Sequence, residues 1–195
     1  MNSLRPTSPE ALLDAMSWAL AHKVPLELIG GGTKRAIGRP VEAEATLDLS
    51  GLDGIGLYEP AELVLSARAG TKLVEIEAAL AESGQRLGFE PPDYALLLGG
   101  EPGRQTLGGI VAANLAGSRR LSAGAARDHV LGFSAVSGRG EAFKSGGRVV
   151  KNVTGYDLSK LICGSWGTLA ALAEITVKVL PRPEAETTLL LHGLD

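Results

Sequence analysis

Hydrophobic residues near the start of the chain recur at helical spacing. Ser8-Pro9-Glu10 is typical of a helix start, because serine caps the first amides, proline suits the first turn and an acid favours the positive end. Apolar residues then follow three or four positions apart, at Leu12, Leu13, Met16 and Leu20. This spacing predicts a helix from Pro9 to about His22.

A second helical pattern lies between Thr71 and Gly84. Leu73, Ile76 and Leu80 form one apolar face, and glutamates occupy the opposite side. Thr71 is a candidate N-cap, and Gly84 is a candidate end, because glycine readily adopts the left-handed conformation that closes many helices.

Short apolar runs bounded by glycine or proline predict strands. They lie at Leu26–Ile29, Ala45–Leu49, Leu63–Arg68, Val130–Ser137, Gly140–Phe143 and Ala173–Leu180. Shorter helices are predicted over Leu107–Leu115 and Leu158–Cys163, and the stretch Phe89–Gly109 is typical of a loop. The element order predicts an α+β fold with mixed sheets flanked by helices. We expect two lobes, an N-terminal lobe of about residues 1–90 and a second lobe of about residues 91–183.

The composition narrows the possible functions. With 19 Lys and Arg against 22 Asp and Glu, the net charge of −3 gives no electrostatic attraction for nucleic acid. Cys163 is the single cysteine, which excludes an intrachain disulfide and an intrachain iron–sulfur site. His22, His129 and His192 lack metal-ligand spacing, so no metal site is predicted. No apolar stretch is long enough for a transmembrane segment, which indicates a cytoplasmic chain.

Glycine is over-represented, at 26 of 195 residues, and the most conspicuous group is the run Gly30-Gly31-Gly32-Thr33-Lys34 after a predicted strand. Successive glycine amides can converge on an anion because no side chain blocks the approach, so a side chain at Gly31 is expected to intrude on bound phosphates. A surface turn is the alternative interpretation. GxGxxG and GK[ST] are both absent here, which disfavours a Rossmann fold and a P-loop.

Two further segments have candidate chemistry. Small residues over 106–117 expose one helix surface and its first amides, which suits a flat ring or an anionic chain, although helix packing also favours them. The segment 151–158 and Gly164–Leu169 are ambiguous alone: Lys151 could lie near a ligand or simply flank a helix, and Asp157 is a candidate N-cap. Arg119-Arg120 could bind a carboxylate, face a partner or be solvated.

Together these segments resemble the FAD-binding domain of the vanillyl-alcohol-oxidase/PCMH flavoprotein family, over almost the whole chain. Within that family the likeness is greatest to the E subunits of bacterial glycolate oxidases. The stretches that carry it are Gly38–Val41, Glu90–Pro92, Leu115–Arg120, Arg127–Gly132, Lys151–Leu158 and Lys178–Pro183.

The resemblance implies a two-lobed PCMH-type fold and an FAD site. Gly30, Gly31, Gly32, Thr33 and Lys34 would hold the pyrophosphate through backbone amides. The segment along the ribityl chain and isoalloxazine would comprise Thr106, Gly108, Gly109, Ala113, Asn114, Ala116 and Gly117, and Leu172 would contact the adenine end. FAD is expected to bind noncovalently, because the histidine that some members link to flavin is not found in or near the glycine loop.

The resemblance also implies an activity, which is hydride transfer from a 2-hydroxy acid such as glycolate to flavin, giving the 2-oxo acid. The implied partners are the larger flavoprotein subunit and the iron–sulfur subunit of glycolate oxidase, and any membrane association would run through them. The family's C-terminal cap domain is absent before Asp195. No catalytic residue is therefore assigned, and the isolated chain is expected to be inactive. A noncatalytic electron-relay or assembly subunit is the alternative function, and a sugar-nucleotide flavin reductase is less favoured.

Overall fold

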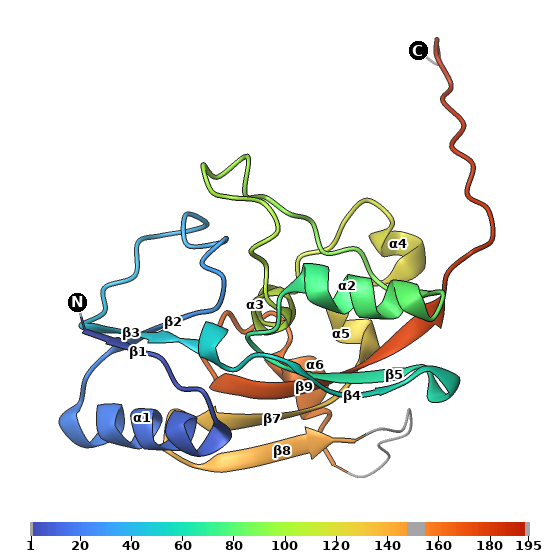
Figure 1. Cartoon of the computed structure of the whole chain (residues 1–195). Coiled ribbons are helices and arrows are strands. Elements are labelled where there is room, and N and C mark those ends of the chain that lie inside the picture. Colours follow the sequence, from blue (N-terminus) through green and yellow to red (C-terminus); the bar gives the residue numbers. More distant parts are fainter. Residues whose placement is uncertain (1, 148–154, 194–195) are drawn as a thin grey trace.

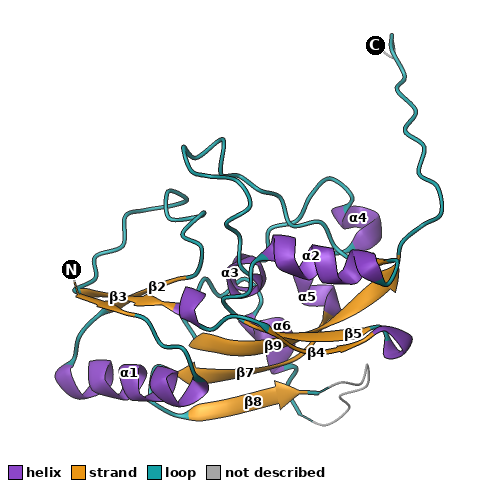
Figure 2. Cartoon of the chain, viewed as in Figure 1, coloured by secondary structure: helices purple, strands orange, loops and turns teal. Residues whose placement is uncertain are grey.

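The computed structural model describes residues 2–147 and 155–193, and its strands form two sheets (Figures 1 and 2). The smaller sheet is parallel, in the order β1-β3-β2, with β1 at Asn2–Leu4, β2 at Leu26–Ile29 and β3 at Ala45–Asp48. The larger sheet is antiparallel, in the order β4-β5-β9-β7-β8, and β6 pairs with the far end of β9. Its strands are β4 (Ile55–Glu59), β5 (Val64–Arg68), β6 (Gln85–Leu87), β7 (Val130–Ser137), β8 (Ala142–Gly146) and β9 (Ala170–Pro181).

Helices cover both sheets, and short 3-10 turns lie at Leu49–Gly51 and Pro60–Glu62. The helices are α1 (Pro9–His22), α2 (Leu73–Glu82), α3 (Leu107–Ala113), α4 (Arg120–Ala123), α5 (Ala126–His129) and α6 (Leu158–Ile162). Parallel and antiparallel sheets with helices packed on them confirm the predicted α+β class.

The strand β9 lies between two hydrophobic cores. Alternate residues of a strand face opposite sides of the sheet. Ala170 and Leu172 belong to the larger core, which is shared with α2, α3 and β5, whereas Ala171 and Ala173 join the smaller core beneath α1 and the parallel sheet. Burial on both faces makes this 12-residue strand the element that holds the two sheets together.

The helix predicted from the first apolar pattern is confirmed. It spans Pro9–His22, and the Ser8 hydroxyl accepts a hydrogen bond of 3.2 Å from the Ala11 amide. The second helix is confirmed over Leu73–Glu82, but the predicted N-cap is wrong. Thr71 is fully buried, and its hydroxyl exchanges hydrogen bonds with the backbone of Gly54, so Lys72 takes the cap position without a side-chain bond.

Several short elements were not predicted. The strands β1 and β6 and the one-turn helices α4 and α5 have too few residues to show a periodic pattern, and β4 is largely exposed and lacks the apolar run of a buried strand. The predicted helix over Leu107–Leu115 ends earlier, at Ala113, because Asn114 takes a left-handed conformation with φ 51°. The lobe boundary near residue 90 stays a prediction. The strands themselves divide differently, since β4 and β5 already belong to the larger sheet.

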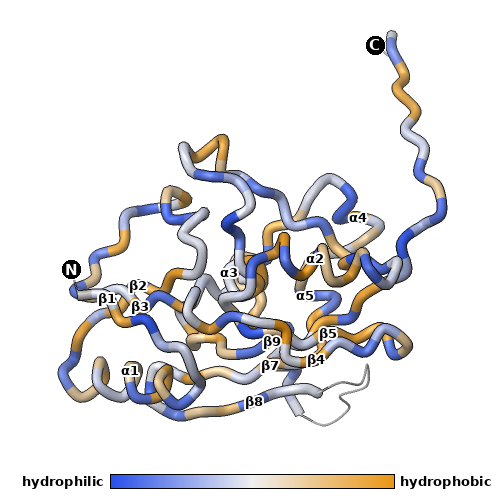
Figure 3. The backbone as a smooth tube through the Cα atoms, viewed as in Figure 1, coloured by the Kyte–Doolittle hydropathy of each residue, from blue (hydrophilic) through white to orange (hydrophobic). Residues whose placement is uncertain are grey.

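The loop between β6 and α3 is closed at its base by Asp93. Its carboxylate accepts hydrogen bonds from the Ala95 amide at 3.0 Å and the Gly103 amide at 2.8 Å. At the tip, Leu96 and Leu97 are each 80% exposed, where Figure 3 shows a hydrophobic stretch. The returning limb of this loop carries Arg104 and Gln105 to the glycine loop after β2.

Cys163 provides a chemical test of the core. The thiol is buried and donates a hydrogen bond to the Ser159 carbonyl at 3.1 Å, and burial raises its pKa from 9.0 to about 12. Since the thiolate is the reactive form, alkylation of the folded chain at pH 8 should be slower than that of the denatured chain by on the order of 1,000-fold.

The raised pKa of Cys163 also determines the direction in which the stability of the folded chain changes with pH. The unfolded thiol loses its proton near pH 9.0 and the folded one near pH 12, so this residue's contribution to stability should fall across that window. Iodoacetamide labelling followed by mass spectrometry measures the first effect, and equal rates in the two states would contradict the buried position.

Candidate functional site

A cleft of about 470 Å³ is lined by β2, the glycine loop that follows it, α3 and the start of β9. It contains most of the residues predicted for a ligand, namely Gly30, Gly31, Gly32, Thr33, Lys34, Thr106, Gly108, Gly109, Ala113 and Leu172. These residues come from three separate segments of the sequence, and the fold brings them to one place.

Three of the predicted residues do not line this cleft. The Asn114 side chain accepts a hydrogen bond of 3.0 Å from the Arg127 amide, which ties the end of α3 to α5. The Gly117 amide donates to the Glu90 carbonyl at 2.8 Å. Ala116 lies between them in the sequence. Whether any of the predicted residues contacts a ligand stays a proposal.

The glycine loop packs closely against the limb that leads to α3. A Cβ on Gly31 would overlap the carbonyl oxygen of Arg104, and a Cβ on Gly30 would overlap the hydroxyl of Thr106. Gly32 has φ +71°, a conformation that glycine adopts easily. The sequence predicted that a side chain at Gly31 would intrude on bound phosphates. The structure corrects this reason, because such a side chain would first overlap the protein's own backbone.

The amides of Gly31, Gly32 and Thr33 are the clearest sign of a ligand. Among the residues that the structure describes, no hydrogen bond is donated by any of these three amides. Backbone N–H groups are normally paired, and successive unpaired ones beside a cleft are typical of an anion-binding nest. The loop geometry therefore fits a phosphate or diphosphate group.

The first amides of α3 are not available in the same way, contrary to the expectation from sequence. Leu107 donates to the Thr71 carbonyl at 2.9 Å and Gly108 to the Ala69 carbonyl at 2.7 Å. The Gly109 amide donates to the Thr106 hydroxyl at 3.3 Å. The small residues of this helix thus serve close packing, since a Cβ on Gly108 would lie 2.9 Å from Ala69.

Lys34 links the two loops that form one wall of the cleft. Its ammonium donates a hydrogen bond of 2.8 Å to the side-chain oxygen of Gln105, which is buried. Burial lowers the pKa of Lys34, and the nearby Asp93 carboxylate opposes that shift. The arrangement indicates that Lys34 fixes the glycine loop against the Gln105 limb.

Replacing Lys34 with methionine should therefore destabilise the FAD-free chain. The Gln105 oxygen would lose its partner while buried, which costs about 1–3 kcal/mol, or a melting temperature lower by about 2–12 °C. Arg35→Met is the matched control, because Arg35 pairs with Glu27 at 2.7 Å on an exposed edge where such pairs contribute about 0–1 kcal/mol. Equal melting temperatures for Lys34→Met and the parent would contradict the proposed link.

The sequence singled out the segment Gly164–Leu169 as ambiguous but did not assign Trp166 within it to a site, and this residue also lines the cleft. It lies between Gly164 and Gly167, and its backbone has φ +52°, which is unusual for a bulky residue. The only local signal was a tryptophan between glycines. Other lining residues that the sequence did not single out include Leu26, Leu28, Arg39, Val41 and Ala112.

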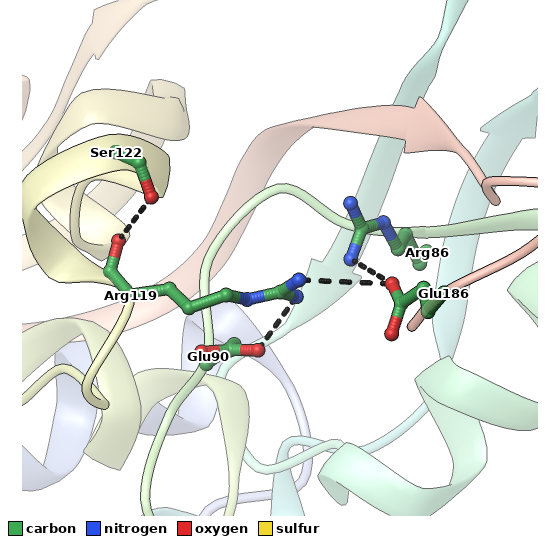
Figure 4. Close-up of polar contacts among 5 residues, drawn as sticks. All are labelled: Arg86, Glu90, Arg119, Ser122 and Glu186. Atoms are coloured by element: carbon green, nitrogen blue, oxygen red, sulfur yellow. Dashed lines mark hydrogen bonds and ion pairs between the residues drawn. The ribbon is translucent and has the colours of Figure 1, made fainter. Parts of the chain in front are cut away.

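Figure 4 shows where one of the two adjacent arginines lies. Arg119 forms an ion pair of 2.6 Å with Glu90 and one of 3.6 Å with Glu186, and Arg86 also reaches Glu186 at 3.4 Å. The hydrogen bond to Glu90 raises the pKa of Arg119. Its guanidinium is therefore occupied by carboxylates of the chain itself, and the contact of Arg86 with Glu186 ties the C-terminal tail to β6.

The remaining sequence predictions concern Lys151, Asp157, membrane crossing and metal binding. Lys151 and its neighbours up to residue 154 lie outside the described residues. Asp157 is confirmed as the N-cap of α6, since its carboxylate accepts from the Lys160 amide at 3.1 Å. Within residues 2–147 and 155–193, no helix has the length and apolar character needed to cross a bilayer, and no cluster of His, Cys, Asp and Glu could hold a metal.

Comparisons with known proteins match this geometry. The profile of the FAD binding domain family matches residues 3–146. Subunit GlcE of glycolate oxidase from Escherichia coli (strain K12) is 49% identical over 92% of this chain and 49% of its own length. A D-lactate dehydrogenase from Archaeoglobus fulgidus is 29% identical over 96% of this chain and 40% of its own length.

A solved structure of alkyldihydroxyacetonephosphate synthase superposes with a TM-score of 0.76 at 24% identity, over 94% of this chain and 32% of that protein, which supports the fold. The chain thus spans half or less of the length of these relatives. The family match extends over residues 3–146, and the unpaired amides beside the cleft fit the diphosphate of such a cofactor. The chain belongs to the FAD-binding domain family, and FAD is its cofactor.

Proposed function

We propose that this chain is the FAD-binding part of an oxidoreductase subunit that converts a 2-hydroxy acid, glycolate in the first place, to the 2-oxo acid. The observation that carries the proposal is the cleft with three unpartnered amides, in a chain similar over 92% of its length to a glycolate oxidase subunit. A second relative is named as a D-lactate dehydrogenase, which places both in the same substrate class.

The chain's own residues would bind and orient the cofactor. Gly31, Gly32 and Thr33 would donate their amides to the diphosphate, and Thr106, Gly108, Gly109 and Ala113 would form the wall of the cleft beside it. FAD, when bound, supplies the acceptor for a hydride from the substrate C–H bond. Lys34 would keep the glycine loop in place through Gln105.

We further propose that substrate-binding groups come from outside the described residues. Among the residues that the structure describes, the charged ones that line the cleft are Glu27, Lys34, Arg35 and Arg39, and three of them are already committed to contacts within the chain. The partners would be a larger flavoprotein subunit and an iron–sulfur subunit, in the cytoplasm or on a membrane reached through them.

A chimera tests this function. In the E. coli glycolate oxidase, the segment of GlcE that matches this chain would be exchanged for residues of this chain, and dye reduction would be measured with glycolate, D-lactate and D-2-hydroxyglutarate. We expect glycolate-dependent reduction to be retained within about tenfold. A chimera that assembles and holds FAD but reduces no dye with any of the three acids would contradict the proposal.

The isolated chain is expected to bind FAD without oxidising glycolate, because near-attack positioning needs a paired carboxylate and a base on rigid elements. The FAD-loaded chain would be mixed anaerobically with glycolate and its flavin absorbance followed. Bleaching at about 1 per second or faster would show that the substrate site lies within this chain.

A further inference from the structure

Trp166 has a backbone conformation that tryptophan rarely adopts. Its φ of +52° lies in the left-handed region, where Cβ crowds the following carbonyl and glycine or asparagine is usual. The flanking residues Gly164 and Gly167, with φ +86° and +77°, follow that preference. A glycine at position 166 would suit this turn better than tryptophan does.

The role of the Trp166 backbone does not require an indole. Its amide donates to the Ala112 carbonyl at 2.9 Å, and the Gly164 amide donates to the Val111 carbonyl at 3.2 Å. These bonds satisfy carbonyls at the end of α3, which any residue with this φ could do.

Core packing does not explain the side chain either. Trp166 is 45% exposed and belongs to neither hydrophobic core of the described residues. It lines the cleft, and among the described lining residues it is the sole aromatic one. A large, flat, half-exposed side chain in a strained turn beside a nucleotide cleft is typical of a stacking platform.

We propose that the Trp166 indole stacks on the adenine ring of the bound dinucleotide and so contributes to selection of FAD over FMN. This proposal rests on the proposed FAD site. The apolar residues Leu26, Leu28 and Val41 line the same cleft and would enclose a flat ring. Gly167 packs on Leu28, where a Cβ would lie 3.4 Å from that side chain, so the turn is fixed against β2.

The extent of the cleft favours the adenine ring over the flavin ring. Its volume of about 470 Å³ lies in the lower part of the range of roughly 300–1,000 Å³ for small-molecule sites, which suits one nucleotide better than a whole dinucleotide. The amide nest marks the diphosphate, and α3 ends beyond Ala113 in Asn114, whose side chain is committed to Arg127. The cleft therefore fits the adenosine diphosphate half, and the flavin ring extends past it.

The test uses the chain's two tryptophans, Trp18 and Trp166. Trp18 lies on α1 and contacts His22 at a ring-centroid distance of 5.2 Å, so a Trp18→Phe variant leaves Trp166 as the single emitter. ADP is the probe, because it carries adenine and the diphosphate but absorbs no tryptophan emission. We expect a saturable change in Trp166 emission. Unchanged emission at an ADP concentration that calorimetry shows to be saturating would overturn the proposal.

Affinity measurements separate the two rings. Trp166→Leu should weaken FAD and ADP binding by about 5- to 150-fold, the range for loss of one stacked base, and leave FMN binding unchanged within about twofold. Trp166→Phe should retain most of the affinity. A loss confined to FMN would contradict the adenine assignment, and equal FAD and ADP affinities for Trp166→Leu and the parent would contradict stacking.

Trp166→Gly distinguishes a ligand contact from a structural role. It relieves the strained φ, so the FAD-free chain should melt at the parent temperature or above, while ADP binding falls as for Trp166→Leu. A lower melting temperature with unchanged ADP affinity would show that the indole serves the fold. If the parent bound neither FAD nor ADP, the proposed function would fail together with this inference, whereas FAD binding without any Trp166 effect would overturn the inference alone.

Discussion

A Gly31→Val chain is expected to lose FAD binding by at least 100-fold and to melt below the parent. The Cβ of any residue at position 31 would overlap the carbonyl oxygen and carbon of Arg104, which are backbone atoms and cannot swing aside. The two loops must then separate, which disturbs the amide nest and the bond between Lys34 and Gln105. Overpacking of this kind costs about 1–3 kcal/mol, or about 2–12 °C in melting temperature.

The matched control is Gly38→Ala in the same loop. Gly38 also has a positive φ, of +87°, but a Cβ there has no neighbour within 4 Å. Strain of about 1 kcal/mol is expected, and FAD affinity should stay within about threefold of the parent. Flavin fluorescence titration measures the FAD affinity of both variants. Parent-like affinity in Gly31→Val would contradict a role of the glycine loop in FAD binding.

Saturating FAD should raise the melting temperature of the parent chain by about 5–11 °C. A ligand that binds only the folded state at 100 times its Kd adds about 2.7 kcal/mol, and each kcal/mol shifts the melting temperature of a chain of this size by about 2–4 °C. Differential scanning calorimetry over a range of FAD concentrations measures the shift.

Gly31→Val should show no such rise at the same FAD concentrations, which separates specific binding from general stabilisation by flavin. ADP should give a smaller rise than FAD. A melting temperature of the parent that does not depend on FAD would contradict binding to the folded chain, since linkage requires a shift.

Local patterns in the sequence were sufficient for the long elements and for the position of the glycine loop. The helix Pro9–His22 carries its cap and its apolar face within one segment, and the strand Leu26–Ile29 is followed directly by the glycines. These signals are local in sequence, so no knowledge of the tertiary contacts is needed to find them.

Contacts between distant segments could not be predicted. The neighbours of Thr71 in the sequence are typical of an N-cap, yet its hydroxyl bonds to the backbone of Gly54. The first amides of α3 are likewise paired with the carbonyls of Ala69 and Thr71, which are distant in the sequence. From the sequence, Gly31 was predicted only to contact phosphate, and only the fold shows that the Arg104 carbonyl packs against it. Trp166 shows its left-handed φ only in three dimensions.

The family resemblance added what local patterns lacked. It predicted that the segments around Gly30, Thr106 and Leu172 serve one ligand, and the structure places all three in one cleft. It also grouped Asn114 and Gly117 with them, whereas the structure ties these residues to Arg127 and Glu90 outside the cleft. The family motifs therefore predicted which segments lie near each other in space, but they did not distinguish residues that line the cleft from residues that only pack within the chain.

The most direct test of the central claim is the stoichiometry and mode of flavin binding. The purified chain would be incubated with FAD, separated from free flavin by gel filtration and precipitated with acid. We expect one FAD per chain before precipitation and all of the flavin in the supernatant afterwards, because in the proposed site the unpaired amides of residues 31–33 would hold the diphosphate without a covalent link. A folded chain that retains no FAD, or flavin that stays with the acid precipitate, would contradict the account.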